Sequence, residues 1–245
     1  MPGIGTAINI VTVLIGGTTG LLLGEKVSED IKDIVMKGLG LLTLVLGFRM
    51  ALETTNIFIS MASIVFGGIL GTWWKLEARL DNLGDYFELR FANLIGNLGV
   101  DGSFSKGFVT ASLVFCVGPI TVIGAIQDGL TGNYKLLAIK SGLDGFAAMA
   151  FASTLGAGVL LSILTLIIYQ GGLTFVAALF SGTLSGIDVS NSLAVNELSA
   201  TGGILIIGIG FLLLEISDLK VSNYLPALFI APTIIGLLSV FGINI

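Results

Sequence analysis

The chain has 245 residues, of which 54% are hydrophobic and 11% charged; its formal net charge is −5 and its mean hydropathy +1.02. A soluble domain carries about 25% charged residues, so this composition excludes an ordinary soluble protein. The chain has no histidine, the commonest metal ligand, and one cysteine, Cys116, which excludes an internal disulfide or a thiolate metal cluster. We therefore expect a membrane protein that binds no metal, no cofactor and no nucleic acid.

Apolar runs long enough to cross a lipid bilayer recur along the chain. A ~30 Å hydrocarbon core needs about 20 residues of helix. We expect an all-α, polytopic bundle of about eight spans that forms one transmembrane domain over residues 1–245. The expected spans are 4–24, 38–52, 57–74, 107–126, 136–154, 156–180, 200–214 and 224–241. The first is too long and too evenly apolar for a cleavable signal.

Residues 75–98 have a different pattern, because charged side chains stand between the apolar ones. The apolar positions recur every three or four residues, as on one face of a helix: Leu76, Leu80, Leu83, Phe87, Phe91, Leu94 and Leu98. We expect an amphipathic helix on the cytoplasmic side, lying along the membrane surface or packed on the bundle.

The number of crossings depends on the junction STLGAG at 153–158. Eight crossings result if the chain turns there, and seven if 136–180 is continuous. With eight, the basic residues divide unequally: Lys26, Lys32, Lys37, Lys75, Arg79, Arg90, Lys106 and Lys220 share one side, against Arg49, Lys135 and Lys140 on the other. Excess Lys and Arg marks the cytoplasmic side, so we expect a multi-pass protein of the cell membrane with its N-terminus outside.

Two pairs of segments resemble each other along the chain. The run GLLTLVLGF, which begins at Gly40, matches GILIIGIGF, which begins at Gly203, and the pair Gly16-Gly17 matches Gly171-Gly172. The matches occur in the same order, which favours a duplication. The glycine-rich faces suit close helix packing within one chain or in a homo-oligomer.

The duplication predicts two repeat units of three spans each, 1–74 and 156–243, with the central spans of 107–154 between them. With eight crossings the two units enter the membrane from opposite faces. Such an inverted repeat is typical of secondary transporters, whose sites lie near the midplane on broken helices. With seven crossings the repeats are parallel, and the inference weakens.

Lys140 and Asp144 are the strongest candidates for a functional site. Each ionisable group at membrane depth costs about 2.5–3.5 kcal/mol, and spacing of four residues places both on one helix face. One interpretation is a buried ion pair that fixes helix packing. The other, which we favour, is a site where Lys140 holds an anion or Asp144 holds a cation or proton, because Gly142 and Gly145 leave room for a cavity.

Asp128 and the pair Gly118-Pro119 have both structural and functional interpretations. The run QDGLTGN around Asp128 is ordinary turn chemistry, which predicts a solvent-facing turn; the alternative is a gate near the outer end of the fourth span. A Gly-Pro pair commonly kinks a helix, and in transporters such a kink exposes carbonyl groups to a cavity. The embedded amides Asn9 and Gln170 fit interhelical hydrogen bonds, or ligands of the same site.

The run GPITVIGAIQDGLTGNYKLLAIKSGLDGFAAMAFASTLGAGVLLSILTLIIYQGGLT resembles the signature of the YdfK/YqgA-like membrane proteins of bacteria and archaea, domain-of-unknown-function family 554. Asn9, Gly16-Gly17, Gly202-Gly203 and NYLPALFIAP near the C-terminus fit the same pattern, so the resemblance covers the whole chain. It implies a multi-spanning inner-membrane protein, often labelled a transporter candidate. The family supplies no substrate or catalytic residue.

These observations favour a secondary transporter of a small solute, coupled to H⁺ or Na⁺, over three alternatives. A non-transporting scaffold would use the helix of 75–98 as its contact. An intramembrane aspartyl hydrolase would need Asp128 and Asp144 as an acid pair, but the glycine-flanked signature of such enzymes is absent. A passive channel is the third. We expect no enzyme, and a lysine near the site favours an anion or an amino acid as the solute.

Overall fold

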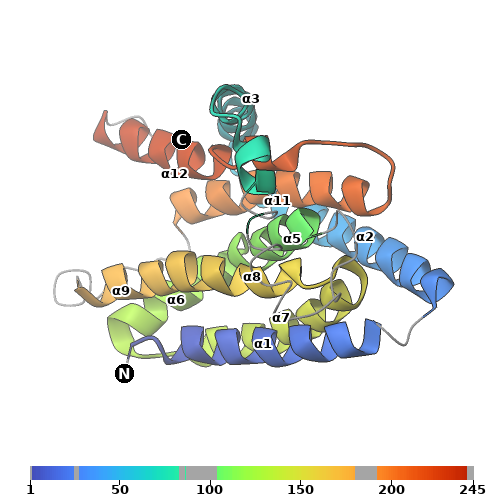
Figure 1. The fold of residues 1–245 in the computed structure, drawn as a ribbon. Helices are drawn as coiled ribbons and strands as arrows, with labels where there is room; N and C mark the ends of the chain where they lie inside the picture. Colours follow the sequence, from blue (N-terminus) through green and yellow to red (C-terminus); the bar gives the residue numbers. More distant parts are fainter. Residues whose placement is uncertain (1, 25–27, 83–85, 87–103, 180–191, 242–245) are drawn as a thin grey trace. The chain divides into compact units, whose positions relative to one another are not determined.

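A computed structural model describes residues 2–24, 28–82, 86, 104–179 and 192–241 of the chain (Figure 1). Within these residues, six helices are long and apolar enough to cross a membrane, and the number rises to eight if each of two bent helix pairs is one span. The expectation of an all-α bundle with about eight spans is confirmed by this architecture.

The six long candidates are α1, α2, α7, a helix that runs through α8, η1 and α9, α11, and a helix that runs through η2 and α12. Their bounds are Ile4–Gly24, Glu29–Ala51, Lys135–Leu155, Gly158–Leu179, Leu193–Leu213 and Val221–Val240. The bent pairs are α3 (Ile57–Trp73) with Leu76–Asn82, at 56°, and α5 (Phe104–Cys116) with α6 (Pro119–Thr131), at 60°.

Several predicted bounds need correction. Helix α2 begins at Glu29 rather than 38, because its first turns are polar and hydropathy alone passes over them. Helix α11 begins at Leu193 rather than 200, for the same reason. Of the amphipathic helix expected at 75–98, the helical turns Leu76–Asn82 are described, and nearly all of the remainder lies outside the described residues.

The junction at 153–158 is a break between two helices. Helix α7 ends at Leu155, Gly156 has a φ of 75°, and α8 begins at Gly158. Positive φ values are adopted readily by glycine alone, so this residue allows the chain to turn. The interpretation with separate passes, on which eight crossings depend, is the one that the backbone favours.

The chain folds into two compact units. Unit 1 comprises Met1–Gly38, Asn82–Cys116 and Ile120–Ile187, and unit 2 comprises Leu39–Asp81, Val117–Pro119 and Asp188–Ile245. The units are defined by packing and the predicted repeats by sequence, so the division into repeat units stays a prediction.

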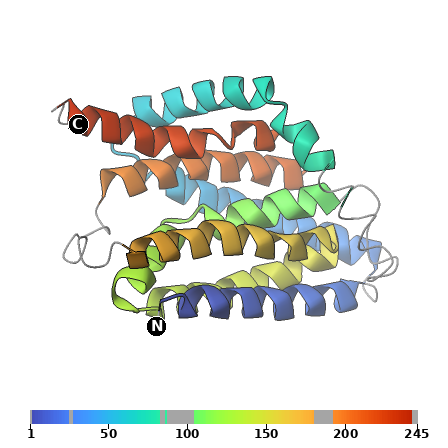
Figure 2. The same cartoon turned by 60° about the vertical axis from the view of Figure 1, so that its left-hand side comes forward.

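In unit 1, α1 lies beside α7 and runs parallel to it (Figure 2). Gly16 and Gly20 of α1 meet the backbone of Gly145 and Met149 of α7, where a Cβ atom would overlap a carbonyl group. Glycine is therefore required for this close approach, as in many membrane helix pairs. Helices α5 and α8 are also parallel neighbours in unit 1. Phe104 at the start of α5 meets Gly158 at the start of α8, and further along both helices Ser112 and Thr165 share a hydrogen bond of 2.9 Å.

In unit 2, the part of α2 from Leu39 onward packs antiparallel to α11. Gly47 lies against Gly203 and Ile207, and Gly210 lies against Leu44. Helix α3 packs antiparallel to the helix of η2 and α12, along which Gly67 meets Ala227 and Gly71 meets Asn223.

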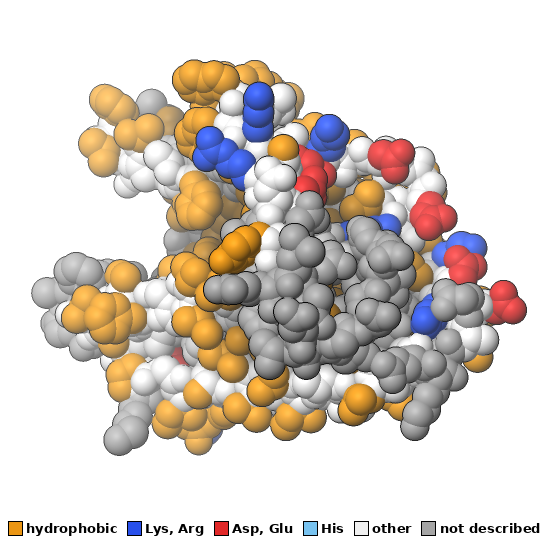
Figure 3. Space-filling view, in the orientation of Figure 1, with side chains coloured by type: hydrophobic (Ala, Val, Ile, Leu, Met, Phe, Trp, Pro, Cys, Tyr) orange, Lys and Arg blue, Asp and Glu red, His pale blue; other side chains and the backbone are white. Residues whose placement is uncertain are grey.

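Large apolar side chains cover much of the described surface, as Figure 3 shows. Examples are Ile139 and Phe146 of α7 and Phe175 of α9, each about two-thirds exposed or more. Charged side chains gather over the beginning of α2 in the same view. Apolar exposure on this scale is a lipid-facing surface rather than a surface for water.

Candidate functional site

Lys140 and Asp144 form a buried ion pair on one face of α7. The ammonium group of Lys140 donates to Oδ2 of Asp144, and each residue is only 6% exposed. The contact predicted from the spacing is therefore made, and both charged groups are removed from the lipid-facing surface.

The ammonium group has a second partner, at the break between α5 and α6. Lys140 Nζ donates to the carbonyl oxygen of Phe115 at 2.7 Å, and Thr121 Oγ1 donates to the same oxygen at 3.0 Å. In a continuous helix the N–H of residue 119 would bond to this carbonyl, but Pro119 has no N–H. The predicted kink at Gly118-Pro119 thus leaves an acceptor that the lysine and the threonine use.

Asn9 of α1 connects the carboxylate to a third helix. Its Nδ2 donates to Asp144 Oδ2 at 2.9 Å and to Gln170 Oε1 at 3.0 Å, and Gln170 Nε2 donates to Thr6 Oγ1 at 3.2 Å. Both partners of Nδ2 are acceptors, so the orientation of the Asn9 amide follows from its neighbours. Its Oδ1 is buried and has no hydrogen-bond partner within the described part of the chain.

Gln170 lies in a local irregularity of its helix. Between α8 (Gly158–Thr165) and α9 (Gly172–Leu179) the turns of η1 (Leu166–Gly171) are π-helical. Insertions of this kind are rare and frequently occur at functional sites. Here Gln170 is fully buried and reaches α1, the helix that also carries Asn9.

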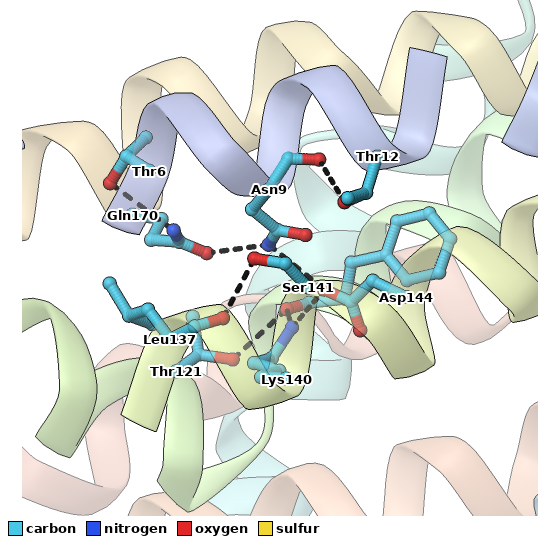
Figure 4. A network of polar contacts seen from close by, with 10 residues as sticks. Thr6, Asn9, Thr12, Thr121, Leu137, Lys140, Ser141, Asp144 and Gln170 are labelled. Atoms are coloured by element: carbon cyan, nitrogen blue, oxygen red, sulfur yellow. Dashed lines mark hydrogen bonds and ion pairs between the residues drawn. The ribbon is translucent and has the colours of Figure 1, made fainter. Parts of the chain in front are cut away.

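We call the connected residues the central polar network: Thr6, Asn9, Phe115, Thr121, Lys140, Asp144 and Gln170. Figure 4 labels all of them except Phe115. The network joins α1, α7, η1 and the two helix ends at the α5–α6 break, and all of its members lie within helices. Its two charges sum to zero. Oxygen atoms from a carboxylate and a backbone carbonyl bind the one cationic group, an arrangement that suits a proton or a small cation.

Asp128 does not lie in a solvent-facing turn, so that interpretation is wrong. It is a fully buried residue of α6, and the helix continues to Thr131 before Gly132 (φ 70°) turns the chain. Its Oδ2 accepts from the backbone N–H groups of Gly3 at 3.2 Å and Gly5 at 3.0 Å. N–H groups at the start of a helix have no carbonyl partner within that helix, and a negative charge is favourable there. Asp128 supplies both to α1.

The two aspartates serve different contacts within unit 1. Asp128 meets the first turn of α1, whereas Asp144 meets Asn9 and Lys140, and none of the described hydrogen bonds joins one aspartate to the other. Gly145, expected to leave a cavity, instead lies against Thr12 of α1, while Gly142 faces open space. No group of three or more Cys, Asp or Glu suited to a metal occurs among the residues that the structure describes.

Sequence reasoning missed a third buried carboxylate, Glu197 of α11 in unit 2. It is fully buried and accepts from Thr54 Oγ1, from the backbone N–H and the hydroxyl of Thr55, from the N–H of Asn56 and from Ser60 Oγ, at 2.7–3.2 Å. The signal was the run Thr54-Thr55-Asn56 just before α3, a set of donors without an assigned acceptor. Glu197 holds the start of α3 against α11.

Comparisons with known proteins agree over nearly the whole chain. The family model described as "Protein of unknown function (DUF554)" matches residues 4–236. The chain is 29% identical to "Uncharacterized membrane protein YdfK" of Bacillus subtilis (strain 168) over 244 residues, which cover 98% of this chain and 99% of that protein. It is 30% identical to "Uncharacterized protein YqgA" of Escherichia coli (strain K12) over 235 residues, 93% and 94% of the two chains. No solved structure matches it.

Proposed function

The chain belongs to the DUF554 family, and we propose that it is an ion-coupled secondary transporter of a small solute whose site is built on Lys140 and Asp144. The observation that carries the proposal is the position of this ion pair against the end of a broken helix. Transporter sites are commonly formed by discontinuous helices whose freed carbonyl groups coordinate ions at membrane depth. Phe115 supplies such a carbonyl, at 2.7 Å from the ammonium group.

The cost of the central polar network supports a functional rather than a purely structural role. Buried ion pairs are often no more stabilising than apolar side chains of similar volume. Here two charges, two amides and two irregular backbone segments are buried within helices of the candidate spans. Irregular backbone at membrane depth is tolerated where protein or a water-filled cavity satisfies it, and a site is the usual reason for keeping it.

Packing in unit 2 supports the inverted repeat. The sequence alignment that pairs Gly40 with Gly203, and Gly47 with Gly210, also pairs Leu44 with Ile207. Gly47 contacts Ile207, and Gly210 contacts Leu44. If each residue is replaced by its counterpart in the alignment, the first contact becomes the second. Reciprocal contacts of this kind are the mark of a two-fold relation, and α2 and α11 run in opposite directions, as an inverted repeat requires.

The relative directions of the helices support eight crossings. With alternating passes, the first and fifth spans run the same way and the second and seventh run opposite ways. The parallel pair α1 and α7 and the antiparallel pair α2 and α11 agree with this order. The distribution of Lys and Arg then favours an N-terminus outside the cell.

A non-transporting scaffold is the second candidate, and one observation favours it. Lys140 and Asp144 find partners in each other, in Asn9 and in Phe115, as groups with only a structural role would do. An aspartyl hydrolase is less well supported, because Asp128 binds the start of α1 rather than Asp144.

The test is ligand-dependent stability of the purified protein in detergent, against small anions, cations, amino acids and metabolites. A ligand at 100 times its Kd raises the free energy of unfolding by about 2.7 kcal/mol if it binds only the folded state. Each ligand that raises the Tm is retested in Asp144→Asn and Lys140→Ala, with Lys135→Ala as the control, since Lys135 is exposed on the same helix.

Binding that is lost in both site variants and kept in the control supports the proposal, and flux into liposomes then measures transport. An apolar double variant, Lys140→Met with Asp144→Leu, that retains the cellular function of the protein would favour the scaffold instead.

A further inference from the structure

We propose, on the basis of the transporter function above, that the ammonium group of Lys140 is a tethered cation which occupies the position of a sodium ion. It follows that this position does not bind Na⁺ while Lys140 fills it, which leaves H⁺ as the coupling ion at this site.

The ammonium group is bound by the kinds of atom that hold Na⁺ in transporters. Unwound backbone carbonyls and the C-terminal ends of half-helices coordinate Na⁺ there. Phe115 is the penultimate residue of α5, and its carbonyl oxygen lies 2.7 Å from Lys140 Nζ. The carboxylate of Asp144 provides the negative charge that balances a monovalent cation.

One more oxygen is available beside this position. Asn9 Nδ2 donates to Asp144 Oδ2, so Oδ1 of the same amide is close to the ion pair, and it is buried without a partner among the described residues. An acceptor of this kind, fully removed from solvent, destabilises the folded state when it stays unsatisfied. A bound cation would satisfy it if the lysine were absent.

Lys140 and a sodium ion exclude each other at this position. Two positive charges in contact repel each other strongly in a buried site that water screens poorly, and Asp144 balances one charge only. Around Lys140 the other described titratable groups are Cys116, at the end of α5, and Tyr169 of η1, which interacts with Cys116. The described part of α1 contributes Asn9 and no charged side chain.

The surroundings also argue against an anion as the ligand of Lys140. The described partners of the ammonium group are two oxygen acceptors, and the nearest amide, Asn9, presents its donor to Asp144 and Gln170. An anion would therefore have to displace Asp144 from Lys140. A site of oxygen acceptors favours cationic ligands and protons.

The test is to remove the tethered cation and supply a free one. Lys140→Ala and Lys140→Ser leave space and keep the oxygen ligands, whereas Lys140→Met fills the space, and the double variant Lys140→Ala with Asp144→Asn removes the charge. The Tm of each protein is measured in detergent, in chloride salts of choline, Na⁺, Li⁺ and K⁺ at matched ionic strength.

We expect the Tm of the wild type to be the same in Na⁺ and in choline. Lys140→Ala and Lys140→Ser should gain a saturable stabilisation by Na⁺, and Lys140→Met and the double variant should not. A saturable Na⁺ response of the wild type would overturn the inference, and so would space-creating variants that fold in choline and respond to none of the three cations. If neither variant can be purified, the Na⁺ titration of the wild type decides.

The outcome is distinguishable from failure of the transporter proposal. Stabilisation of Lys140→Ala by Na⁺, without any flux of solute into liposomes, would support the inference of a tethered cation and contradict the transporter proposal. Flux of the wild type that requires Na⁺ would support transport and overturn the inference of a tethered cation.

Discussion

The carbonyl oxygen of Phe115 accepts a hydrogen bond from the ammonium group of Lys140 at 2.7 Å because Pro119, four residues later, has no N–H to offer it. Phe115 and Lys140 belong to different helices and are 25 positions apart. A break in one helix thus provides the second ligand of a charge on another. The break and the ion pair are one arrangement rather than two separate features.

Pro119→Ala tests this relationship. The variant regains an N–H that competes with Lys140 for the Phe115 carbonyl, so we expect the amide of residue 119 to become protected from hydrogen exchange. Binding of any ligand of the site should weaken about tenfold, or about 1.4 kcal/mol. Pro232→Ala is the control, since Pro232 lies inside α12 in unit 2. Unchanged binding in Pro119→Ala would separate the break from the site.

The ion pair itself is tested by a double-mutant cycle. Asp144→Leu or Lys140→Met alone leaves a buried charge without its partner, which we expect to cost about 3–5 kcal/mol of unfolding free energy. The double variant should be close to the wild type in stability, because apolar pairs often replace buried ion pairs without loss. Denaturation in detergent measures all four proteins. Additive losses in the double variant would mean that the two groups act independently.

The sequence predicts the spans and the ion pair because both follow from local rules. Apolar length identifies α1, α3 and α7 to within a residue or two, and helical spacing brings Lys140 to Asp144. It also places Asn9 and Gln170 in the membrane as interhelical hydrogen-bond formers, and they do bond to each other. The sequence does not predict which helices Asn9 and Gln170 connect, because their partners depend on packing between segments far apart in the chain.

Asp128 and Glu197 show where local rules fail. Asp-Gly is a turn signal, but the buried N–H groups of Gly3 and Gly5 keep Asp128 in a helix facing α1. Glu197 lies outside the span of 200–214 that hydropathy predicts, because polar residues lower the hydropathy of the first turns of α11. In both cases the partner of the carboxylate is the start of a helix more than 100 residues away, a relationship that no short-range pattern contains.

Asn9→Asp is expected to be more harmful than Asn9→Ala, although it is nearly isosteric. Nδ2 of Asn9 donates to Asp144 Oδ2 and Gln170 Oε1, and a carboxylate in its place would present an acceptor to two acceptors. Asn9→Ala should cost about 1–3 kcal/mol for the groups left unpaired, and Asn9→Asp more. Thermal unfolding near neutral pH compares them. Equal stability of the two variants would indicate that water enters and satisfies both partners.

Gly20→Ala is expected to disrupt the contact between α1 and α7. Its Cβ would overlap the carbonyl group of Met149, so one helix must shift. Gly142→Ala is the matched control on α7, because its Cβ would meet nothing within 4 Å, and alanine there should raise stability by about 0.4–1 kcal/mol. The two Tm values are compared in the same detergent. A neutral Gly20→Ala would mean that α1 and α7 have room to separate.

Glu197→Ala is expected to loosen the start of α3 without affecting the central polar network. The carboxylate accepts from two backbone N–H groups, of Thr55 and Asn56, and from three hydroxyls, and hydrogen bonds to a charged group contribute about 1.5–3 kcal/mol each but do not add. We expect a loss of several kcal/mol, with Glu197→Gln intermediate, because its amide turns a donor toward donors. Hydrogen exchange should increase at residues 54–60, while ligand binding at Lys140 and Asp144 is retained in the folded fraction. Loss of binding at full folding would instead place Glu197 in the same functional unit as the ion pair.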